Sequence, residues 1–197
     1  MSGKFWKITI LATLSIGVLM LALVPVNAAG KYETISGRMY GTSTQMGRNA
    51  GVELTIYRPS TEDERQALIQ AFKQGQSEGL SKALSKMKSV GRISLTGTIG
   101  YDVAFIRVMP TDVGRRIRFV TNRKIAFGEA RNQTRSMAYD LTAGEFMLND
   151  QDTKKSEGVL YPAAQLVINK DGEPQWELNQ NPWRVNGIVD WRPKEEK

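Results

Sequence analysis

The chain of 197 residues contains no cysteine and no histidine. These absences exclude protein classes whose chemistry needs either side chain: cysteine proteases, Ser-His-Asp hydrolases, zinc fingers, histidine-ligated zinc enzymes, cysteine-bound iron–sulfur proteins and disulfide scaffolds. They also exclude a histidine-based pH switch. We therefore expect no cofactor and no metal centre, and the composition favours a non-enzymatic role over an enzyme.

Long apolar runs are scarce, and the longest lies at the N-terminus. Residues 8–24 are apolar or small throughout, follow two lysines and end at Pro25, and Ala28 then completes a site of small residues for a signal peptidase. The pattern predicts a signal peptide over residues 1–28, cleaved near Ala28, and a periplasmic or secreted protein. The alternative is an uncleaved anchor, because the run reaches the lower limit for spanning a bilayer.

Residues 29–193 indicate one domain, and residues 194–197 form a charged tail. A chain of this length buries roughly 70% of its unfolded surface, so it can form a core without disulfides. The formal net charge is +7, and loss of the two N-terminal lysines with the signal peptide reduces it to +5. An exported chain of this size without cysteine is more typical of a bacterial envelope than of small eukaryotic secreted modules.

Short stretches in which apolar and polar residues alternate predict about eight to ten strands. An Asp-Gly dipeptide at Gly172 is typical of the turn in a β-hairpin. Because, apart from one helical insert, the strands follow one another without intervening helices, the sheet is expected to be mostly antiparallel. The expected strands are residues 32–40, 52–57, 92–99, 102–109, 115–121, 137–141, 145–148, 159–169, 174–179 and 183–191, with a break at 142–144.

Residues 60–88 predict two short amphipathic helices that join near Gly75. Ser60 or Thr61 can cap the first helix, because an acidic residue three positions later completes a capping box. The apolar faces expected to pack on the sheet are Leu68, Ala71 and Phe72 in the first helix, and Leu80, Ala83, Leu84 and Met87 in the second. The expected fold is α+β: a mostly antiparallel curved sheet or partial barrel with one two-helix insert packed on it, preceded by a signal peptide helix.

Basic residues concentrate between positions 107 and 135, where the local charge is +6. In a strand, Arg116 and Arg118 share one face, and Ile117 and Phe119 share the other. One interpretation of the run is an anion-binding surface, because the planar guanidinium group binds phosphate through two hydrogen bonds. The favoured interpretation is a solvated strand face that pairs with carboxylates across the sheet. The candidate anion-binding residues are Arg107, Arg115, Arg116, Arg118, Arg123 and Lys124.

Two tryptophans, Trp176 and Trp183, flank an asparagine-rich turn at residues 179–182. Such a pair can stack on sugar rings. The favoured interpretation is that the two rings close the edge of a core, with their indole N–H groups bonded locally.

Carboxylates cluster in sequence at Asp140, Glu145, Asp150, Asp152 and Glu157. Paired carboxylates can carry out glycoside hydrolysis or bind calcium. The spacing lacks the glycine and the terminal glutamate of a calcium-binding EF-hand loop. A solvated loop is therefore the favoured interpretation of this cluster.

Several segments between residues 52 and 189 resemble a family of exported bacterial proteins with no assigned activity. The resemblance implies export and a single domain, and it brings no activity and no catalytic residues. The segments that carry it are Gly91-Arg92-Ile93 with Leu95-Thr96-Gly97, Gly114-Arg115-Arg116-Ile117-Arg118 with Thr121, Gly158-Val159-Leu160-Tyr161-Pro162-Ala163-Ala164, and Leu80-Ser81-Lys82-Ala83-Leu84 with Met87.

Export, the absence of a catalytic constellation and the arginine-rich strands favour a binding or interaction domain without enzymatic activity. Its expected partner is an anionic or amphipathic component of the cell envelope, such as a lipid or a glycan. Nucleic acid is not an expected partner, because an exported chain without a basic–aromatic motif does not suit it. Membrane contact is expected only through the signal segment before cleavage. The alternatives are a glycan-acting or other hydrolase that uses carboxylates, and a purely structural envelope protein.

Overall fold

The computed structural model describes residues 32–123, 125, 141–170, 172, 174–178 and 180–192. The expected signal peptide, the charged tail, Lys124 and Asp140 lie outside these residues. Within the described part of the chain, no helix has both the length and the apolar character that crossing a membrane requires.

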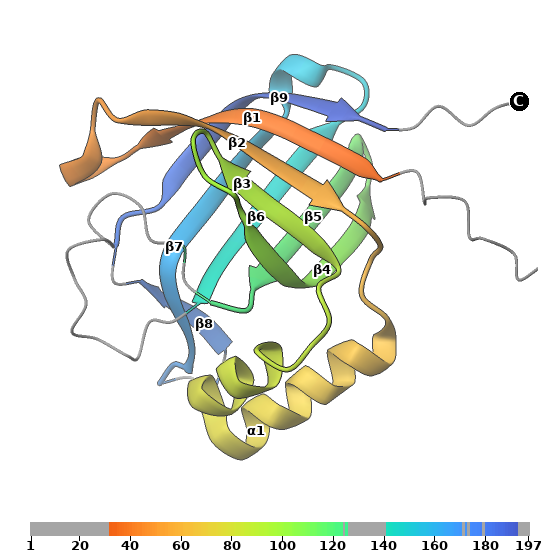
Figure 1. Ribbon diagram of the computed structural model, residues 1–197, viewed down its shortest axis with the longest axis vertical. Helices are drawn as coiled ribbons and strands as arrows, with labels where there is room; N and C mark the ends of the chain where they lie inside the picture. The colour runs from red at the N-terminus through yellow and green to blue at the C-terminus, as the bar shows by residue number, and fades with distance from the viewer. Residues whose placement is uncertain are drawn as a thin grey trace, which may run out of the picture. The chain divides into compact units, whose positions relative to one another are not determined.

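The described residues form one sheet of nine antiparallel strands, eight of which close into a barrel (Figure 1). The order around the ring is β6-β5-β4-β3-β2-β1-β9-β7, and β7 pairs with β6 to close it. The strands are β1 (Glu33–Gly41), β2 (Asn49–Ile56), β3 (Gly91–Leu95), β4 (Tyr101–Thr111), β5 (Gly114–Thr121), β6 (Leu141–Asn149), β7 (Glu157–Ile168), β8 (Pro174–Leu178) and β9 (Trp183–Trp191). The helical elements are α1 (Glu62–Leu84) and the 3-10 turns η1 (Ser43–Gln45) and η3 (Thr153–Lys155).

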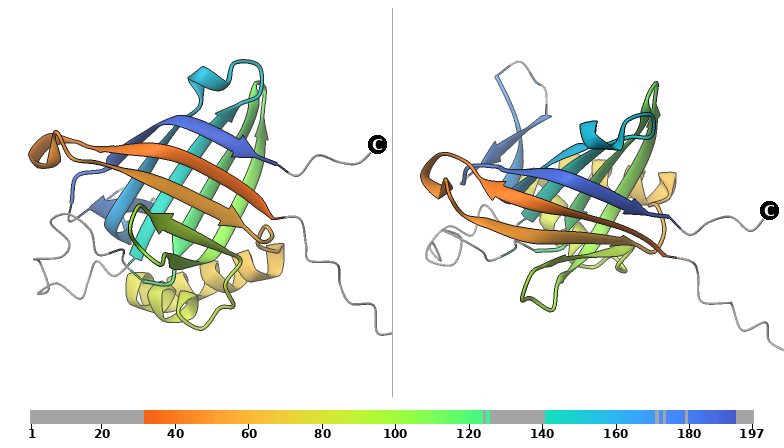
Figure 2. Two further views of the ribbon diagram at one scale, coloured as in Figure 1. Left: turned by 45° about the horizontal axis from the view of Figure 1, so that its top comes forward. Right: turned by 90° about the horizontal axis from the view of Figure 1, so that it is seen from above.

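The sheet is antiparallel as expected, but it is a closed barrel rather than a curved sheet or partial barrel. β1, β2 and β9 cross over β5, β6 and β7, and Figure 2 shows the two layers from further directions. Closure depends on β7, which spans 12 residues. β7 pairs with β6 along one edge, and along the other it pairs first with β9 and then with β8. The pattern of apolar residues predicts strands but does not show which two strands close a ring.

Inward-facing apolar side chains from all eight strands of the ring fill the barrel. Ile35, Leu54 and Leu160 are fully buried there. The rings of Phe119 and Phe146 meet edge to face, with their centroids 5.5 Å apart. The interior is therefore a packed core of the kind found in small barrels.

The expected break at residues 142–144 is wrong, because β6 runs without interruption from Leu141 to Asn149. Gly144 suggested a turn, yet it lies in the middle of the strand. A Cβ atom at this position would lie 2.3 Å from Cζ of Phe119, closer than two heavy atoms can approach. The glycine therefore makes room for a core ring and does not mark a turn.

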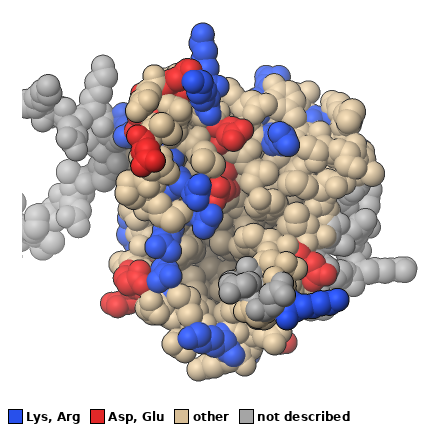
Figure 3. All heavy atoms as spheres, turned by 180° about the vertical axis from the view of Figure 1, so that it is seen from behind, with Lys and Arg blue, Asp and Glu red and all other residues tan. Residues whose placement is uncertain are grey.

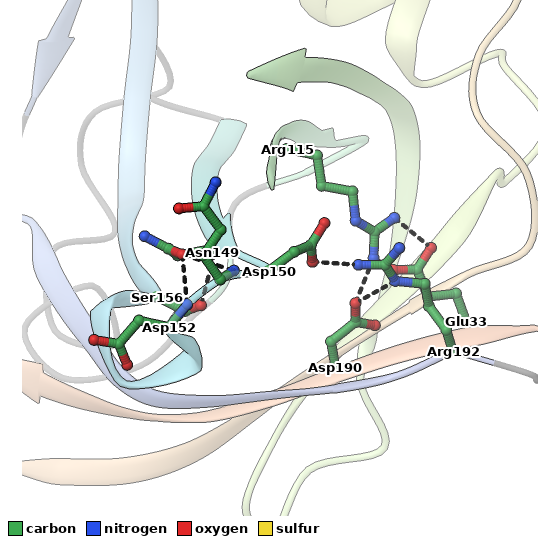
Figure 4. A network of polar contacts seen from close by, with 9 residues as sticks. Glu33, Arg115, Asn149, Asp150, Asp152, Ser156, Asp190 and Arg192 are labelled. Carbon is green, nitrogen blue, oxygen red and sulfur yellow. Dashed lines mark hydrogen bonds and ion pairs between the residues drawn. The ribbon is translucent and has the colours of Figure 1, made fainter. Parts of the chain in front are cut away.

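Arg115 crosses the interior at one end of the barrel and joins opposite walls (Figure 4). It lies on β5, and β1 is four strands away in either direction around the ring. Its guanidinium group binds both oxygens of Glu33 on β1 and, at 2.7 Å, Oδ2 of Asp190 on β9. Arg192 extends the network through 2.6 Å contacts to Asp190 and Asp150. Burial by itself lowers the pKa of Arg115, but Glu33 and Asp190 outweigh it and raise that pKa.

An irregularity in β4 changes which side chains point outward. The register with β5 shifts between Val103 and Phe105. Val103 and Ile106 are both part of the barrel core, whereas Ala104 and Phe105 pack with the residues of α1. Strict alternation would have placed Val103 and Phe105 on the same face. The bulge therefore gives the barrel an apolar outer patch on which a helix can pack.

The expected two-helix insert is present as α1, which breaks at Gln76 and packs on the outside of the barrel. Of the two capping boxes that the sequence allowed, the one at Thr61 is formed, and Glu64 completes it. Leu68, Leu80 and Leu84 are buried against the barrel, with Phe72, Ala83 and Met87 packed beside them. Gln76 has φ 48° and ψ −136°, a conformation in which side chains are strained and glycine is favoured.

We expect Arg115→Met to lower the free energy of unfolding by about 3 kcal/mol, because it leaves the largely buried Glu33 without its cation and Asp190 with Arg192 alone. Denaturant unfolding measures the change. Arg184→Met is the matched control: Arg184 is exposed on β9, and its loss should cost less than about 0.5 kcal/mol. An Arg115→Met protein as stable as the control would show that the ion cluster does not hold the two walls together.

We expect Gln76→Gly to raise the free energy of unfolding by about 1 kcal/mol, since it relieves backbone strain at the break in α1. Gln74→Gly, two residues earlier and within the helix, should lower it by about 1 kcal/mol. Thermal unfolding of both variants shows whether each substitution raises or lowers the free energy of unfolding. If both substitutions destabilise the protein, the strain assigned to Gln76 is contradicted.

Candidate functional site

A cavity of about 660 Å³ lies between α1 and the outer face of the barrel. We call it the outer groove. Its apolar lining comes from Leu68, Ile69, Phe72, Leu80 and Leu84 of α1, and from Phe105, Val120, Leu166, Ile168 and Trp176 of the barrel strands and β8. Its polar lining consists of Arg65, Lys73, Gln76, Arg107 and Arg118. In the view from behind, a hollow lies above the helical end of the molecule, and basic side chains stand near it (Figure 3).

The start of α1 is tied directly to the barrel, and this sets the position of the helical wall. Ser60 donates its backbone N–H to the carbonyl of Ile106 at 2.8 Å, and its hydroxyl accepts the N–H of Ile106 at 3.0 Å. One residue later, Thr61 and Glu64 form the capping box. Arg58 binds both carboxylate oxygens of Glu64, at 2.6 and 2.9 Å. The wall therefore begins at a fixed point beside β4.

The ion pair at the helix start changes the acidity of Glu64. The hydrogen bonds from Arg58 are the largest cause and lower the pKa of Glu64 from 4.5 to about 2. Burial opposes this change, while the backbone N–H of Thr61 adds to it. Glu64 is therefore charged at every pH above its lowered pKa, and its carboxylate also suits the positive end of the helix dipole.

The barrel wall of the outer groove has an apolar part and a cationic part on the same two strands. Phe105 of β4 lies opposite Val120 of β5, and two residues further along, Arg107 lies opposite Arg118. All four side chains line the groove. Strand geometry places the two pairs about 7 Å apart. The wall thus changes from apolar to basic along its length.

The charges around the outer groove are unevenly balanced. Arg118 contacts Glu145, its register partner on β6, and the same carboxylate lies 3.7 Å from Arg116. Arg65 binds Glu62 at 2.6 Å. Arg107 makes no hydrogen bond or ion pair with any described residue. None of the described lining residues is acidic, so the groove surface has a net positive charge.

The structure separates the arginines that the sequence placed on one anion-binding surface. Arg107 and Arg118 meet at the outer groove, and Arg116 points outward on the same strand but does not line it. Arg115 is directed into the barrel, where it is already paired with two carboxylates. Arg123 lies 5.6 Å from the centre of the Tyr101 ring, and Lys124 is outside the described residues.

The two tryptophans proposed as a stacking pair have different surroundings. Trp176 on β8 lines the outer groove. Trp183 is 3% exposed and belongs to the barrel core, so its ring cannot stack on a ligand from solvent. For Trp183 the core interpretation therefore holds, because its position in β9 turns the ring inward.

Sequence reasoning did not single out Ile69, Lys73, Gln76 or Leu166, all of which line the groove. Ile69 beside Leu68 widens the apolar face of the first helix beyond a single stripe, and this pattern in the sequence could have identified Ile69. Leu166 offered none, because it alternates with its neighbours as any strand residue does.

The clustered carboxylates do not form a catalytic pair in the described residues. Glu145 binds arginines, Asp150 binds Arg192, and Asp152 caps η3. Glu33 and Asp190 do approach one another, but Arg115 lies between them. No group of three or more acidic side chains among the described residues could hold a metal ion.

Comparisons of the chain with family models, curated proteins and solved structures gave no match. The resemblance to exported bacterial proteins stays a prediction. The chemistry of the outer groove is therefore the guide to function.

We expect the stability that Glu64 contributes to depend on pH in the acid range. Because its pKa is lowered on folding, the contribution is complete above pH 4.5 and is lost as the pH falls toward about 2. Glu64→Gln keeps an oxygen for the capping box but removes the charge. Since the pair is partly exposed, wild type should exceed this variant by less than about 1 kcal/mol at neutral pH.

Urea unfolding of wild type and Glu64→Gln from pH 7 to pH 2 gives the measurement. The difference between them should shrink toward zero at the acid end. Arg58→Gln should remove most of the same pH dependence, because Arg58 is the main cause of the lowered pKa. A difference that stays constant down to pH 2 would contradict the assignment.

Proposed function

We propose that the protein is a non-enzymatic binding protein that holds the apolar chain of an amphipathic cell-envelope molecule in the outer groove. The observation that carries the proposal is the groove itself, which has an apolar lining on two facing walls and only basic charges among the described lining residues. The proposal keeps the expectation of an exported protein that binds an envelope component, and it gives that component a binding site.

The size and the lining of the groove suit a small amphiphile. Its volume of about 660 Å³ lies within the roughly 300–1,000 Å³ typical of ligand pockets, which are mostly apolar with a few placed polar groups. Phe72, Phe105 and Val120 are only partly buried, so a bound alkyl chain would remove further apolar surface from water. Each buried methylene group contributes about 0.8 kcal/mol.

The barrel interior does not compete for this role. Its centre is filled by buried side chains such as Ile35, Ile93 and Phe119. A ligand that needs apolar surroundings therefore finds them on the outside of the barrel, beneath α1. The two walls of this site come from regular secondary structure, a helix on one side and a sheet on the other.

The hydrolase alternative has less support from the groove. Hydrolysis by carboxylates needs two acidic groups facing a bound substrate. None of the described residues that line the groove is Asp or Glu. A binding site agrees better with this lining than a catalytic site does.

We expect Phe72→Ala to weaken the binding of dodecyl amphiphiles about tenfold, because it removes apolar contact from the helical wall. Isothermal titration calorimetry with dodecanoate and with dodecyl maltoside, both below micelle-forming concentrations, measures the affinity. Ile99→Ala is the control, since Ile99 is 89% exposed in the loop between β3 and β4. The proposal fails if neither amphiphile binds, or if both variants bind as wild type does.

A further inference from the structure

Two arginines lie directly opposite one another on the barrel wall of the outer groove. Arg107 on β4 and Arg118 on β5 are register partners and both point outward into the groove lining. The Cβ atoms of opposite residues in antiparallel strands are about 5 Å apart, and like charges in such a pair destabilise the sheet. The arrangement therefore favours an anion between the two guanidinium groups.

The protein supplies only part of that negative charge. Glu145 is the partner of Arg118 on β6, and it also lies near Arg116, so one carboxylate serves two arginines. Arg107 has neither an ion pair nor a hydrogen bond to any described residue. Its influence on Glu62 is slight, because hydrogen bonds from Gln66 and Arg65 are the main causes that lower the pKa of Glu62, and Arg107 is the smallest.

Because this arginine pair lies next to apolar residues, the groove has an apolar end and a basic end, and these determine the orientation of an amphipathic ligand. Phe105 and Val120 form the preceding register pair on the same outward face, and they continue the groove's apolar lining. A molecule whose chain covers Phe105 and Val120 would bring its head group to Arg107 and Arg118. The step of about 7 Å between the pairs suits the passage from an alkyl chain to its head group.

We infer that the ligand carries an oxyanion head group, a carboxylate or a phosphate, which Arg107 and Arg118 bind together while its alkyl chain lies in the outer groove. This inference rests on the function proposed above and specifies the head group. Guanidinium groups suit it because they bind carboxylate and phosphate through two parallel hydrogen bonds. Glu145 is then an internal competitor that holds Arg118 until the head group replaces it.

The test uses ligands that share a dodecyl chain and differ in head group: dodecanoate, dodecyl phosphate, dodecyl maltoside and dodecyltrimethylammonium. Calorimetry on the purified protein, below micelle-forming concentrations, gives each affinity. Wild type should bind the two anions about tenfold or more tightly than the neutral maltoside. The carboxylate and phosphate arms show which oxyanion the site prefers.

Substitutions of single charged residues test what each of them contributes to anion binding. Arg107→Gln and Arg118→Gln should each lower the affinity for the two anions about tenfold and so remove most of the preference for anions over maltoside. Glu145→Gln should tighten anion binding about two- to fivefold, because the competitor is gone. Arg116→Gln is the matched control, since Arg116 lies on the same strand and near the same carboxylate but outside the groove lining.

Three results would overturn the inference and leave the groove as a binding site. The first is equal affinity of wild type for the anions and for maltoside, and the second is an equal loss of affinity for both in Arg107→Gln. The third is that Lys73→Gln, and not Arg107→Gln or Arg118→Gln, removes the preference for anions. Weaker anion binding in Glu145→Gln would also contradict the inference, because removal of a carboxylate that competes for Arg118 should not weaken the binding of an anionic head group. If no dodecyl compound binds in a manner that depends on Phe72, the proposed function itself fails.

Discussion

Closure of the sheet is the constraint on which the rest of the structure depends. β7 pairs with β6 on one edge and with β9 on the other, so the eight strands have a single inner face. That face holds the core. Apolar residues that point outward on β4 and β5 need another cover, and α1 supplies it. The cover is incomplete, and the outer groove lies beneath α1, lined by residues on both sides of the break at Gln76.

The arginine-rich run shows how one stretch of chain serves two purposes through alternation. Arg115 points inward on β5 and joins opposite walls through Glu33 and Asp190. Arg118, three residues later, points outward and faces Arg107 across the strand pair. A charge enclosed by the barrel is stable only with partners, whereas a charge on the groove wall is available to a ligand. The inward arginine therefore supports the fold, and the outward pair is the basis of the proposed site.

Much of the secondary structure was predictable because it depends on local patterns. Alternation located every described strand except β6 within a few residues, and the capping pattern located the start of α1 at Ser60 or Thr61. One error came from an effect that is not local: Gly144 suggested a break, but the ring of Phe119 from a neighbouring strand requires a glycine there. For Trp183 the sequence favoured the core over a ligand contact, and Trp183 lies in the core.

The sequence alone determined an antiparallel, cysteine-free fold with a helical insert and a concentration of arginine, since these follow from periodicity and composition. Only the tertiary structure decided that the sheet closes, and which arginines meet. Arg107 points outward because the bulge in β4 shifts the alternation after Val103. A register shift and a ring closure arise from pairing between distant strands. The sequence of a single strand does not show which strand it pairs with or in which register.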